Sequence, residues 1–268
     1  MPESSSRVPI LELRGVSKRF GAVQALSNVN FDVYAGEVVG LVGDNGAGKS
    51  TLIKCVAGIH PADDGEIWFE GQRVHIQNPK DAADLGIQTV YQDLALCDNL
   101  DVVGNLYLGR EQTAQLPLDE VSMEKRSIEV LRNLSVSIPS VRTIIASLSG
   151  GQRQSVAISR AVMWNSKLVI LDEPTAALGV LQSKQVLKLI RNLREQGLAV
   201  IVISHNLVDI FEAVDRISVL HLGRNNGVFN VHGTSHEQIV AAITGAEFGN
   251  NDQETVQGKQ SKKGRSSR

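Results

Sequence analysis

Hydrophobic and polar residues alternate with a period of two near the N-terminus. Val29, Phe31 and Val33 alternate with more polar neighbours, and the segment 66–74 (EIWFEGQRV) behaves similarly around Glu70-Gly71. Because successive side chains of a strand point to opposite faces, both segments predict strands with one buried and one exposed face. The Glu-Gly pair suits a hairpin turn. Together the segments predict a small antiparallel sheet.

Three other segments are continuously hydrophobic: Val38–Val42, Leu168–Leu171 and Ala199–Ile203. Such runs are typical of parallel strands that helices cover on both faces. Between the last two runs, apolar residues recur at helical spacing over 186–193, and Gly197 supplies a C-cap. A strand, a helix and a strand therefore follow in order, which predicts an α/β fold with a mostly parallel sheet and a right-handed crossover.

The region from about residue 93 to 147 is more polar and more helical in pattern, and it separates the first parallel strand from the later ones. We expect an inserted helical subdomain over approximately 93–160. From residue 249 onward the sequence has no periodicity and little to bury, so burial cannot offset the entropy of ordering it. A disordered tail is expected over 249–268.

Composition narrows the class of protein. The 268 residues include 27 basic and 29 acidic ones, and a net charge of -2 gives no indication of a nucleic-acid partner. Cys55 and Cys97 are too far apart for a Cys-x-x-Cys motif, which favours packing roles in a reducing compartment. No run approaches the roughly 20 apolar residues of a membrane span, and the start has no signal-peptide pattern. We expect a globular protein that is soluble by itself.

A glycine-rich segment, GDNGAGKST, follows the first hydrophobic run and precedes a helix-like stretch. It matches the phosphate-binding loop pattern, in which backbone N–H groups and a helix N-terminus surround phosphate oxygens. Lys49 would neutralise the β and γ phosphates, Ser50 would ligate Mg²⁺, and Thr51 would donate to the α phosphate. The alternative is a glycine-rich turn with a chance lysine. The candidate nucleotide-binding residues are Gly43, Asn45, Gly46, Ala47, Gly48, Lys49, Ser50 and Thr51.

Two adjacent carboxylates, Asp172 and Glu173, end the second hydrophobic run. The carboxyl end of a parallel strand lies beside the ligand crevice of such sheets. Asp172 would hold Mg²⁺, and Glu173 would orient or deprotonate the attacking water. The alternative is a solvated acidic turn before Pro174, and the phosphate-binding pattern upstream favours the site.

The string Leu148-Ser149-Gly150-Gly151-Gln152 combines two local features. Ser149 and Gln152 have capping-box spacing before an apolar helical pattern, which predicts a well-capped helix. A serine with paired glycines at a helix start also makes an anion site. The two interpretations are compatible.

Taken together, these motifs resemble the ATP-binding cassette (ABC) family, whose signature is this string. The resemblance covers roughly residues 9–245, and we expect an ATPase domain over 8–245. It implies a RecA-like P-loop NTPase core, a small N-terminal antiparallel β subdomain and an inserted helical subdomain. In that family the signature of one subunit caps the γ phosphate bound by another. The resemblance therefore implies ATP and Mg²⁺ as ligands and a homodimer, with Ser149, Gly150, Gly151 and Gln152 on the partner's nucleotide.

The resemblance also assigns roles to single residues. Gln92, in TVYQD, would sense Mg²⁺ and the attacking water and join the core to the helical insert. His205 would contact the γ phosphate, although a lone histidine is usually structural. Phe20 would stack on adenine, with packing in the small sheet as the alternative. The catalytic set is thus Glu173, His205, Gln92 and Lys49, and the metal set is Ser50, Gln92 and Asp172. Gly179 departs from the pattern, because the family commonly has an aspartate there that helps to couple the paired sites.

Within the family, EPTAALGV and the segment 79–111 are similar to the ATPases of bacterial carbohydrate importers of the ribose, xylose and fructose kind. The resemblance implies a peripheral ATPase on the cytoplasmic face of the cell membrane, with separate permease subunits and an extracytoplasmic solute-binding protein. An importer for another solute and a non-transport ABC ATPase of DNA repair or translation are alternatives. A non-hydrolytic subunit would lack Lys49 or Glu173, and a GTPase would show Asn-Lys-x-Asp, which is not found.

Overall fold

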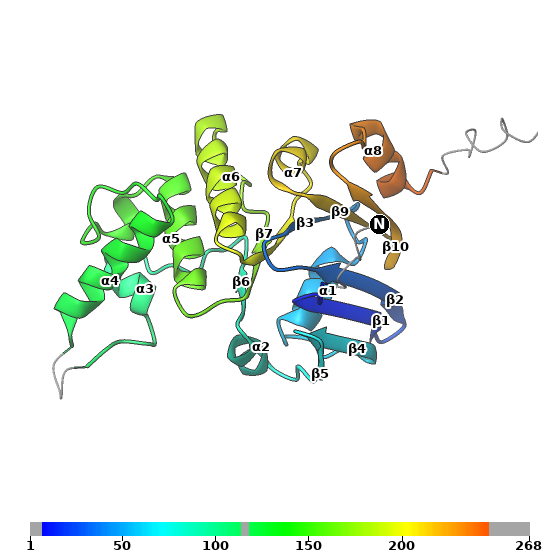
Figure 1. Cartoon of the computed structure of the whole chain (residues 1–268), viewed down its shortest axis with the longest axis horizontal. Coiled ribbons are helices and arrows are strands. Elements are labelled where there is room, and N and C mark those ends of the chain that lie inside the picture. The colour runs from blue at the N-terminus through cyan, green and yellow to red at the C-terminus, as the bar shows by residue number, and fades with distance from the viewer. Residues whose placement is uncertain (1–6, 114–117, 247–268) are drawn as a thin grey trace, which may run out of the picture.

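The computed structural model describes residues 7–113 and 118–246, which form two sheets with helices packed around the larger one (Figure 1). In chain order the elements are β1 (Leu11–Phe20), β2 (Val23–Val33), β3 (Val38–Val42), α1 (Lys49–Val56), β4 (Asp64–Phe69), β5 (Gln72–Val74), α2 (Pro79–Leu85), β6 (Ile87–Val90), α3 (Val102–Tyr107), α4 (Glu120–Asn133), the 3-10 helix η1 (Ile145–Ser147), α5 (Gly150–Val162), β7 (Leu168–Asp172), α6 (Val180–Glu195), β8 (Ala199–Ile203), α7 (Leu207–Ala213), β9 (Arg216–His221), β10 (Arg224–Asn230) and α8 (His236–Thr244).

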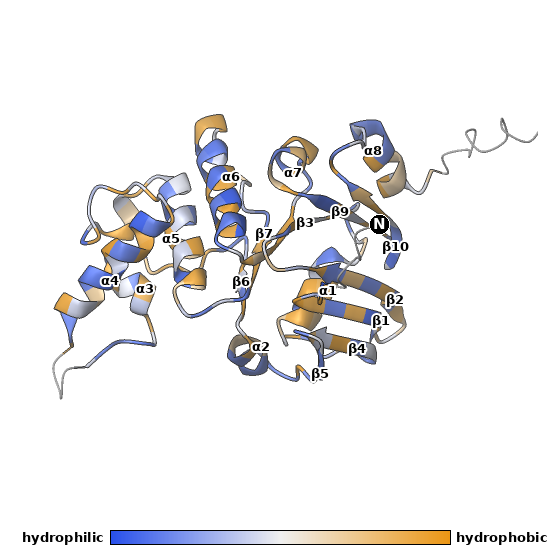
Figure 2. Ribbon diagram, in the orientation of Figure 1, coloured by the Kyte–Doolittle hydropathy of each residue, from blue (hydrophilic) through white to orange (hydrophobic). Residues whose placement is uncertain are grey.

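The smaller sheet is antiparallel and has the strand order β2-β1-β4-β5. Val29, Phe31 and Val33 of β2 are buried, as their alternation predicts, and Figure 2 shows the resulting banding of β1 and β2. The hairpin between β4 and β5 turns at Glu70 (φ 50°) and Gly71 (φ 76°). Two central residues with positive φ match a type I′ turn, so the predicted hairpin is confirmed.

The larger sheet has the order β10-β9-β3-β8-β7-β6, in which only β10 pairs antiparallel. The three continuously hydrophobic runs form β3, β7 and β8 at its centre, which confirms the mostly parallel sheet. In register, Leu41 of β3 pairs with Ile203 of β8, and Ile203 pairs with Asp172 of β7. The segments that follow these strands therefore emerge side by side at the carboxyl edge of the sheet.

Three hydrophobic cores hold the elements together. The first places α1 and part of α2 between the antiparallel sheet and one face of the parallel sheet. The second packs α5, α6, α7 and α8 on the opposite face. A third core joins α3, α4 and α5 away from the strands. Because α5 contributes to both the second and the third core, it links the helical group to the sheet.

Helix α6 ends as its sequence predicts. The N–H of Gly197 (φ 88°) donates to Arg194 O, and the N–H of Leu198 donates to Leu193 O, which together form a Schellman motif. The subdomain limits at 93 and 160 remain a prediction, and the tail predicted over 249–268 lies outside the described residues. Among the described residues, no helix is long and apolar enough to span a membrane.

Candidate functional site

The glycine-rich segment turns from β3 into α1. Helix α1 begins after Gly48, which has a left-handed backbone (φ 102°) and provides no side-chain cap. A Cβ at Gly48 would lie 2.9 Å from Ala25 O, so only glycine fits this turn without a shift. Lys49 Nζ donates to Gly43 O at 2.8 Å and to Asp44 O at 3.0 Å, which holds the ammonium over the loop.

A pocket of about 500 Å³ opens beside this loop. Gly43 is buried and does not line the pocket. The other predicted cradle residues line the pocket together with residues that the sequence did not predict: Asn45, Gly46, Ala47, Gly48, Lys49, Ser50 and Thr51 on one side, and Val23, Gln24, Ala25, Leu222 and Gly223 on the other.

Contacts between distant segments form the part of the pocket that the sequence did not predict. Gly223 N donates to Ala47 O, and Ser27 N donates to Gly223 O, so the turn between β9 and β10 is fastened to the loop and to β2. Leu222, in this turn, has a positive φ of 46° and is largely exposed. Nothing in the local sequence marks these residues as part of a site, because the strand packing alone brings them there.

Electrostatics tie the loop lysine to the carboxylates at the end of β7. Burial lowers the pKa of Lys49, and the negative charges of Glu173, Asp44 and Asp172 oppose that shift. Burial also raises the pKa of Asp172, with a further contribution from Glu173, while Lys49 lowers it. These charge effects agree with the strand register, which brings the lysine loop and both carboxylates to the same edge of the sheet. The sequence predicted this site from the phosphate-loop pattern around Lys49 and from the position of the carboxylates at the end of a parallel strand.

Glu173 and His205 are in direct contact. His205 Nδ1 lies 2.9 Å from Glu173 Oε2, and the carboxylate is mostly buried while the histidine side chain is 75% exposed. Glu173 has a left-handed backbone (φ 51°), which is costly for a residue with a Cβ. Its N–H donates to Ile203 O and so holds this conformation at the end of β7. The strained residue is thus the one that the sequence singled out as the base.

Gln92 follows β6 at the same edge of the sheet and is exposed. The preceding residue, Tyr91, has its pKa raised by burial, lowered by a hydrogen bond with Thr89 and raised by the charge of Asp172. Val90 of β6 pairs with Leu171 of β7, so Tyr91 and Asp172 follow at neighbouring strand ends. The loop containing Gln92 therefore borders the carboxylates.

The signature string begins α5. Ser149 N donates to Gln152 Oε1 at 3.0 Å, and Gln152 N donates to Ser149 Oγ at 3.3 Å, which forms the predicted capping box. Ser149 and Gly150 are exposed, whereas Gly151 packs against Gln182 of α6. In Figure 1 the start of α5 is separated from α1, and none of these residues lines the pocket beside Lys49. Within one chain, the signature and the cradle do not meet.

Two further positions behave differently from the cradle. Phe20, at the end of β1, is 42% exposed and packs edge-on against His60 with centroids 5.2 Å apart. It does not line the pocket, so its adenine contact remains a prediction. Gly179 is the N-cap of α6 with φ -71°, and a Cβ there would meet nothing within 4 Å. An aspartate would therefore fit at this position.

The donor chemistry of the site suits Mg²⁺. Ser50 and Asp172 offer oxygen atoms, the ligands that Mg²⁺ prefers, and the described residues hold no cluster of three or more His, Cys, Asp or Glu. Sites that bind Mg²⁺ through one carboxylate and phosphate oxygens need no such cluster. A hydroxyl beside the lysine loop and one partly buried carboxylate match that kind of site.

Comparisons with known proteins agree on one family. The family model described as "ABC transporter" matches residues 26–176, a range that contains the cradle, the signature string and Asp172-Glu173. The xylose/arabinose import ATP-binding protein XylG of Sulfolobus acidocaldarius is 45% identical over 240 residues, which are 90% of this chain and 96% of that protein. The fructose import ATP-binding protein FrcA of Rhizobium meliloti is 44% identical over 247 residues, which are 89% and 95% of the two chains.

Solved structures show the same fold. An ATP-binding cassette of an ABC transporter in its ADP conformation matches with a TM-score of 0.76 and 28% identity over 88% of this chain and 95% of that chain. A dimeric cassette bound to ADP and Pi after hydrolysis matches with a TM-score of 0.70 and 26% identity over 84% and 100%. The family model, the two relatives and the shared fold agree, and the chain belongs to the ABC transporter family of ATP-binding, ATP-hydrolysing proteins.

Proposed function

We propose that this chain is the ATP-hydrolysing subunit of an importer for a simple sugar, and that it acts as a homodimer. The observation that carries hydrolysis is the 2.9 Å contact between His205 and Glu173 beside the lysine loop. The sugar class rests on the relatives named for xylose/arabinose and fructose import. The dimer rests on the likeness to the dimeric cassette and on the separation of signature and cradle within one chain.

Each residue at the sheet edge has a proposed role. Lys49 and the loop N–H groups bind the β and γ phosphates, and the uncapped start of α1 adds its dipole. Glu173 accepts the proton of the attacking water, whose oxygen forms a bond to the γ phosphorus as the bond to the β–γ bridging oxygen breaks. The contact at Nδ1 orients the imidazole of His205 so that Nε2 contacts the γ phosphate.

We also assign Ser50, Asp172 and Gln92 to Mg²⁺, which when bound neutralises charge on the β and γ phosphate oxygens. Phe20 remains the proposed adenine contact. Ser149, Gly150, Gly151 and Gln152 of one copy would close the pocket of the other. Binding energy from two enclosed nucleotides would then favour the closed dimer, and hydrolysis would reopen it.

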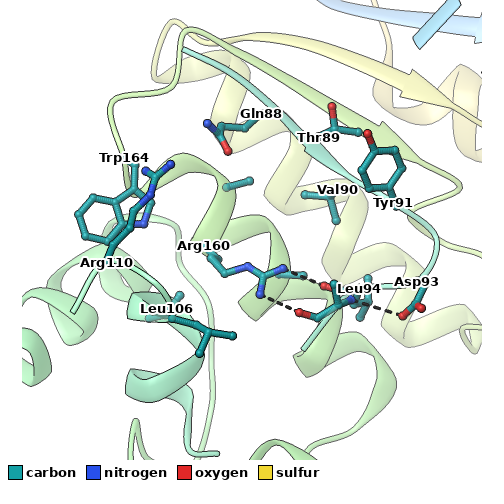
Figure 3. Close-up of a pocket in the computed structure, with 14 residues that line it drawn as sticks. Gln88, Thr89, Val90, Tyr91, Asp93, Leu94, Leu106, Arg110, Arg160 and Trp164 are labelled. Atoms are coloured by element: carbon teal, nitrogen blue, oxygen red, sulfur yellow. Dashed lines mark hydrogen bonds between the residues drawn. The ribbon is translucent and has the colours of Figure 1, made fainter. Parts of the chain in front are cut away.

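We propose that the groove shown in Figure 3 couples this chain to a membrane partner. This cavity of about 230 Å³ lies between the end of β6 and the helical group, next to the Gln92 loop. It combines the apolar side chains of Leu94, Leu106 and Trp164 with the charges of Asp93 and Arg110. We propose that a cytoplasmic segment of a separate permease binds here. The chain would then sit peripherally on the cytoplasmic face of the membrane, and a solute-binding protein would act indirectly from the other side.

Glu173→Gln tests the proposed chemistry. The amide cannot accept the proton, so turnover should fall by at least about 100-fold while ATP still binds. Light scattering should then show a dimer that persists in ATP. Glu212→Gln, an exposed exchange of the same type on α7, should hydrolyse ATP normally. A monomeric Glu173→Gln chain at saturating ATP, with unimpaired hydrolysis, would contradict the proposal.

The transport assignment needs a separate measurement. The ATPase rate should rise when the chain is combined, in proteoliposomes, with the cognate permease and sugar-loaded binding protein. Stimulation by a non-sugar solute alone would replace the sugar assignment while leaving the ATPase mechanism intact.

A further inference from the structure

Arg160 connects two segments that lie far apart in the sequence. It sits near the end of α5, the helix that begins with the signature string. Its Nη1 donates to Ala95 O at 2.8 Å and its Nη2 donates to Leu94 O at 2.9 Å. Figure 3 shows the Arg160 side chain pointing toward the loop at Leu94, with dashed lines that mark the hydrogen bonds. The carbonyls belong to the loop that starts at Gln92.

The surroundings of Arg160 are unusual for an arginine. The side chain is half-buried, and burial lowers its pKa. In the described part of the chain no carboxylate pairs with it, and only backbone oxygens satisfy the two bonded nitrogens. A partly desolvated charge is costly unless hydrogen bonds compensate for lost water. The fork of a guanidinium, which lysine lacks, suits two carbonyls held side by side.

The loop after Gln92 contains an unfavourable backbone conformation. Ala95 has a left-handed backbone (φ 48°), a conformation that is unfavourable for residues with a Cβ. At this turn Ala95 N donates to Asp93 Oδ1 through a long hydrogen bond of 3.4 Å. Farther along the loop, the side chain of Asn105 in α3 bonds to the N–H and the carbonyl of Cys97. The two bonds from Arg160, at 2.8 and 2.9 Å, are shorter than the bond to Asp93 and come from α5. They therefore attach this turn of the loop to α5.

We propose that Arg160 is a positioning residue that clamps the loop after Gln92 to the signature helix, so that Gln92 and the signature string move as one unit. The proposal rests on the proposed ATPase function. It assigns Arg160 no contact with ATP. Loss of the clamp should misplace Gln92 and slow hydrolysis without weakening nucleotide binding.

The test uses the full chain with Mg-ATP and three variants. Arg160→Met removes the fork and keeps an apolar side chain of similar length, and Arg160→Lys keeps the charge. Arg126→Met is the matched control, because Arg126 donates to a backbone carbonyl of the same helical group, Met163 O, but not to the Gln92 loop. The measurements are kcat, KM for ATP, and hydrogen exchange of the peptide 91–98.

For Arg160→Met we expect kcat to fall about tenfold, the loss expected when charge-assisted hydrogen bonds are removed, with KM within about twofold. Exchange over 91–98 should become faster. Arg160→Lys should recover part of both losses, and Arg126→Met should match the parent chain. If Arg160→Met does not fold, Arg160→Lys tests the clamp instead, and it should show a reduced kcat and faster exchange over 91–98 than the parent chain.

Three results would contradict the proposed clamp. The first is a normal kcat in Arg160→Met, or in Arg160→Lys if the Met variant does not fold. The second is a reduced kcat with unchanged hydrogen exchange over 91–98, and the third is a rise in KM that accounts for the whole loss of activity. Absence of ATPase in the parent chain would instead refute the proposed function. The exchange data would still test the clamp in that case.

Discussion

Helices α1 and α5 both begin at candidate phosphate contacts, yet their N-termini are built in opposite ways. Helix α1 starts at a left-handed glycine with no side-chain cap, next to an open pocket. Helix α5 starts with a complete capping box between Ser149 and Gln152. The first N-terminus keeps its donors available for a ligand, whereas the second is already satisfied in part by its own side chains.

This difference explains how the two ends can serve one ligand. In the proposed site, the uncapped helix start over the glycine loop is the main anion site within each chain. A capped start holds the serine and the glycines in a fixed conformation and leaves Ser149 and Gly150 exposed for a surface contact. Since the two ends lie apart in one chain, the account requires a second copy to bring a capped end to an uncapped one.

The largest effect is expected from removing the cation of the uncapped end. Lys49→Met should weaken ATP binding by about 100-fold, because it removes charge-assisted hydrogen bonds to two phosphates. Lys54→Met, in the last turn of the same helix, should bind ATP like the parent chain. Isothermal titration with ATP measures both variants. Equal affinity in the Lys49 and Lys54 variants would remove α1 from the account.

Ser149→Ala tests the capped end. Loss of the cap should cost about 1 kcal/mol of stability, and the ATPase rate should also fall. Ser235→Ala is the matched control, because Ser235 and Gln238 form the same capping box at the start of α8. It should lose similar stability, measured by urea unfolding, and keep its ATPase rate. If both variants lost activity equally, Ser149 would be only a cap.

The smallest effect is expected at the N-cap of α6. Gly179→Asp places a carboxylate where a Cβ meets nothing and should cap α6. Glycine is only slightly worse than aspartate at an N-cap, so the gain should be a few tenths of a kcal/mol, or about 1 °C in Tm. Scanning calorimetry measures the Tm of the variant. A Tm below that of the parent chain would contradict the expected stabilisation.

Much of the fold could be predicted because its signals are local. The runs that form β3, β7 and β8 are continuously apolar, the 70–71 pair fits its turn, and Gly197 ends α6 in the expected conformation. Placing Glu173 and His205 at carboxyl ends of parallel strands predicted that they lie at one edge of the sheet, and the structure adds their direct contact. Periodicity and strand order carry this information directly.

The rest depends on contacts between distant segments. The pocket wall at Leu222-Gly223 arises from hydrogen bonds to Ala47 and Ser27, which no local pattern encodes. The fork from Arg160 to the loop after Gln92 joins residues on different elements for the same reason. Phe20 is a position where the predicted role and the observed packing differ. The family resemblance predicts adenine stacking, but in the structure the ring packs against His60.

The central claim is that the signature serine of one copy closes the nucleotide pocket of the other. The most direct measurement is disulfide crosslinking of an Asn45→Cys, Ser149→Cys chain in a Glu173→Gln, Cys97→Ser background, where Cys55 is buried. The account predicts a covalent dimer that forms in ATP and not without nucleotide, and that is absent from either single-cysteine chain. A failure to crosslink in ATP, with the dimer present by light scattering, would contradict it.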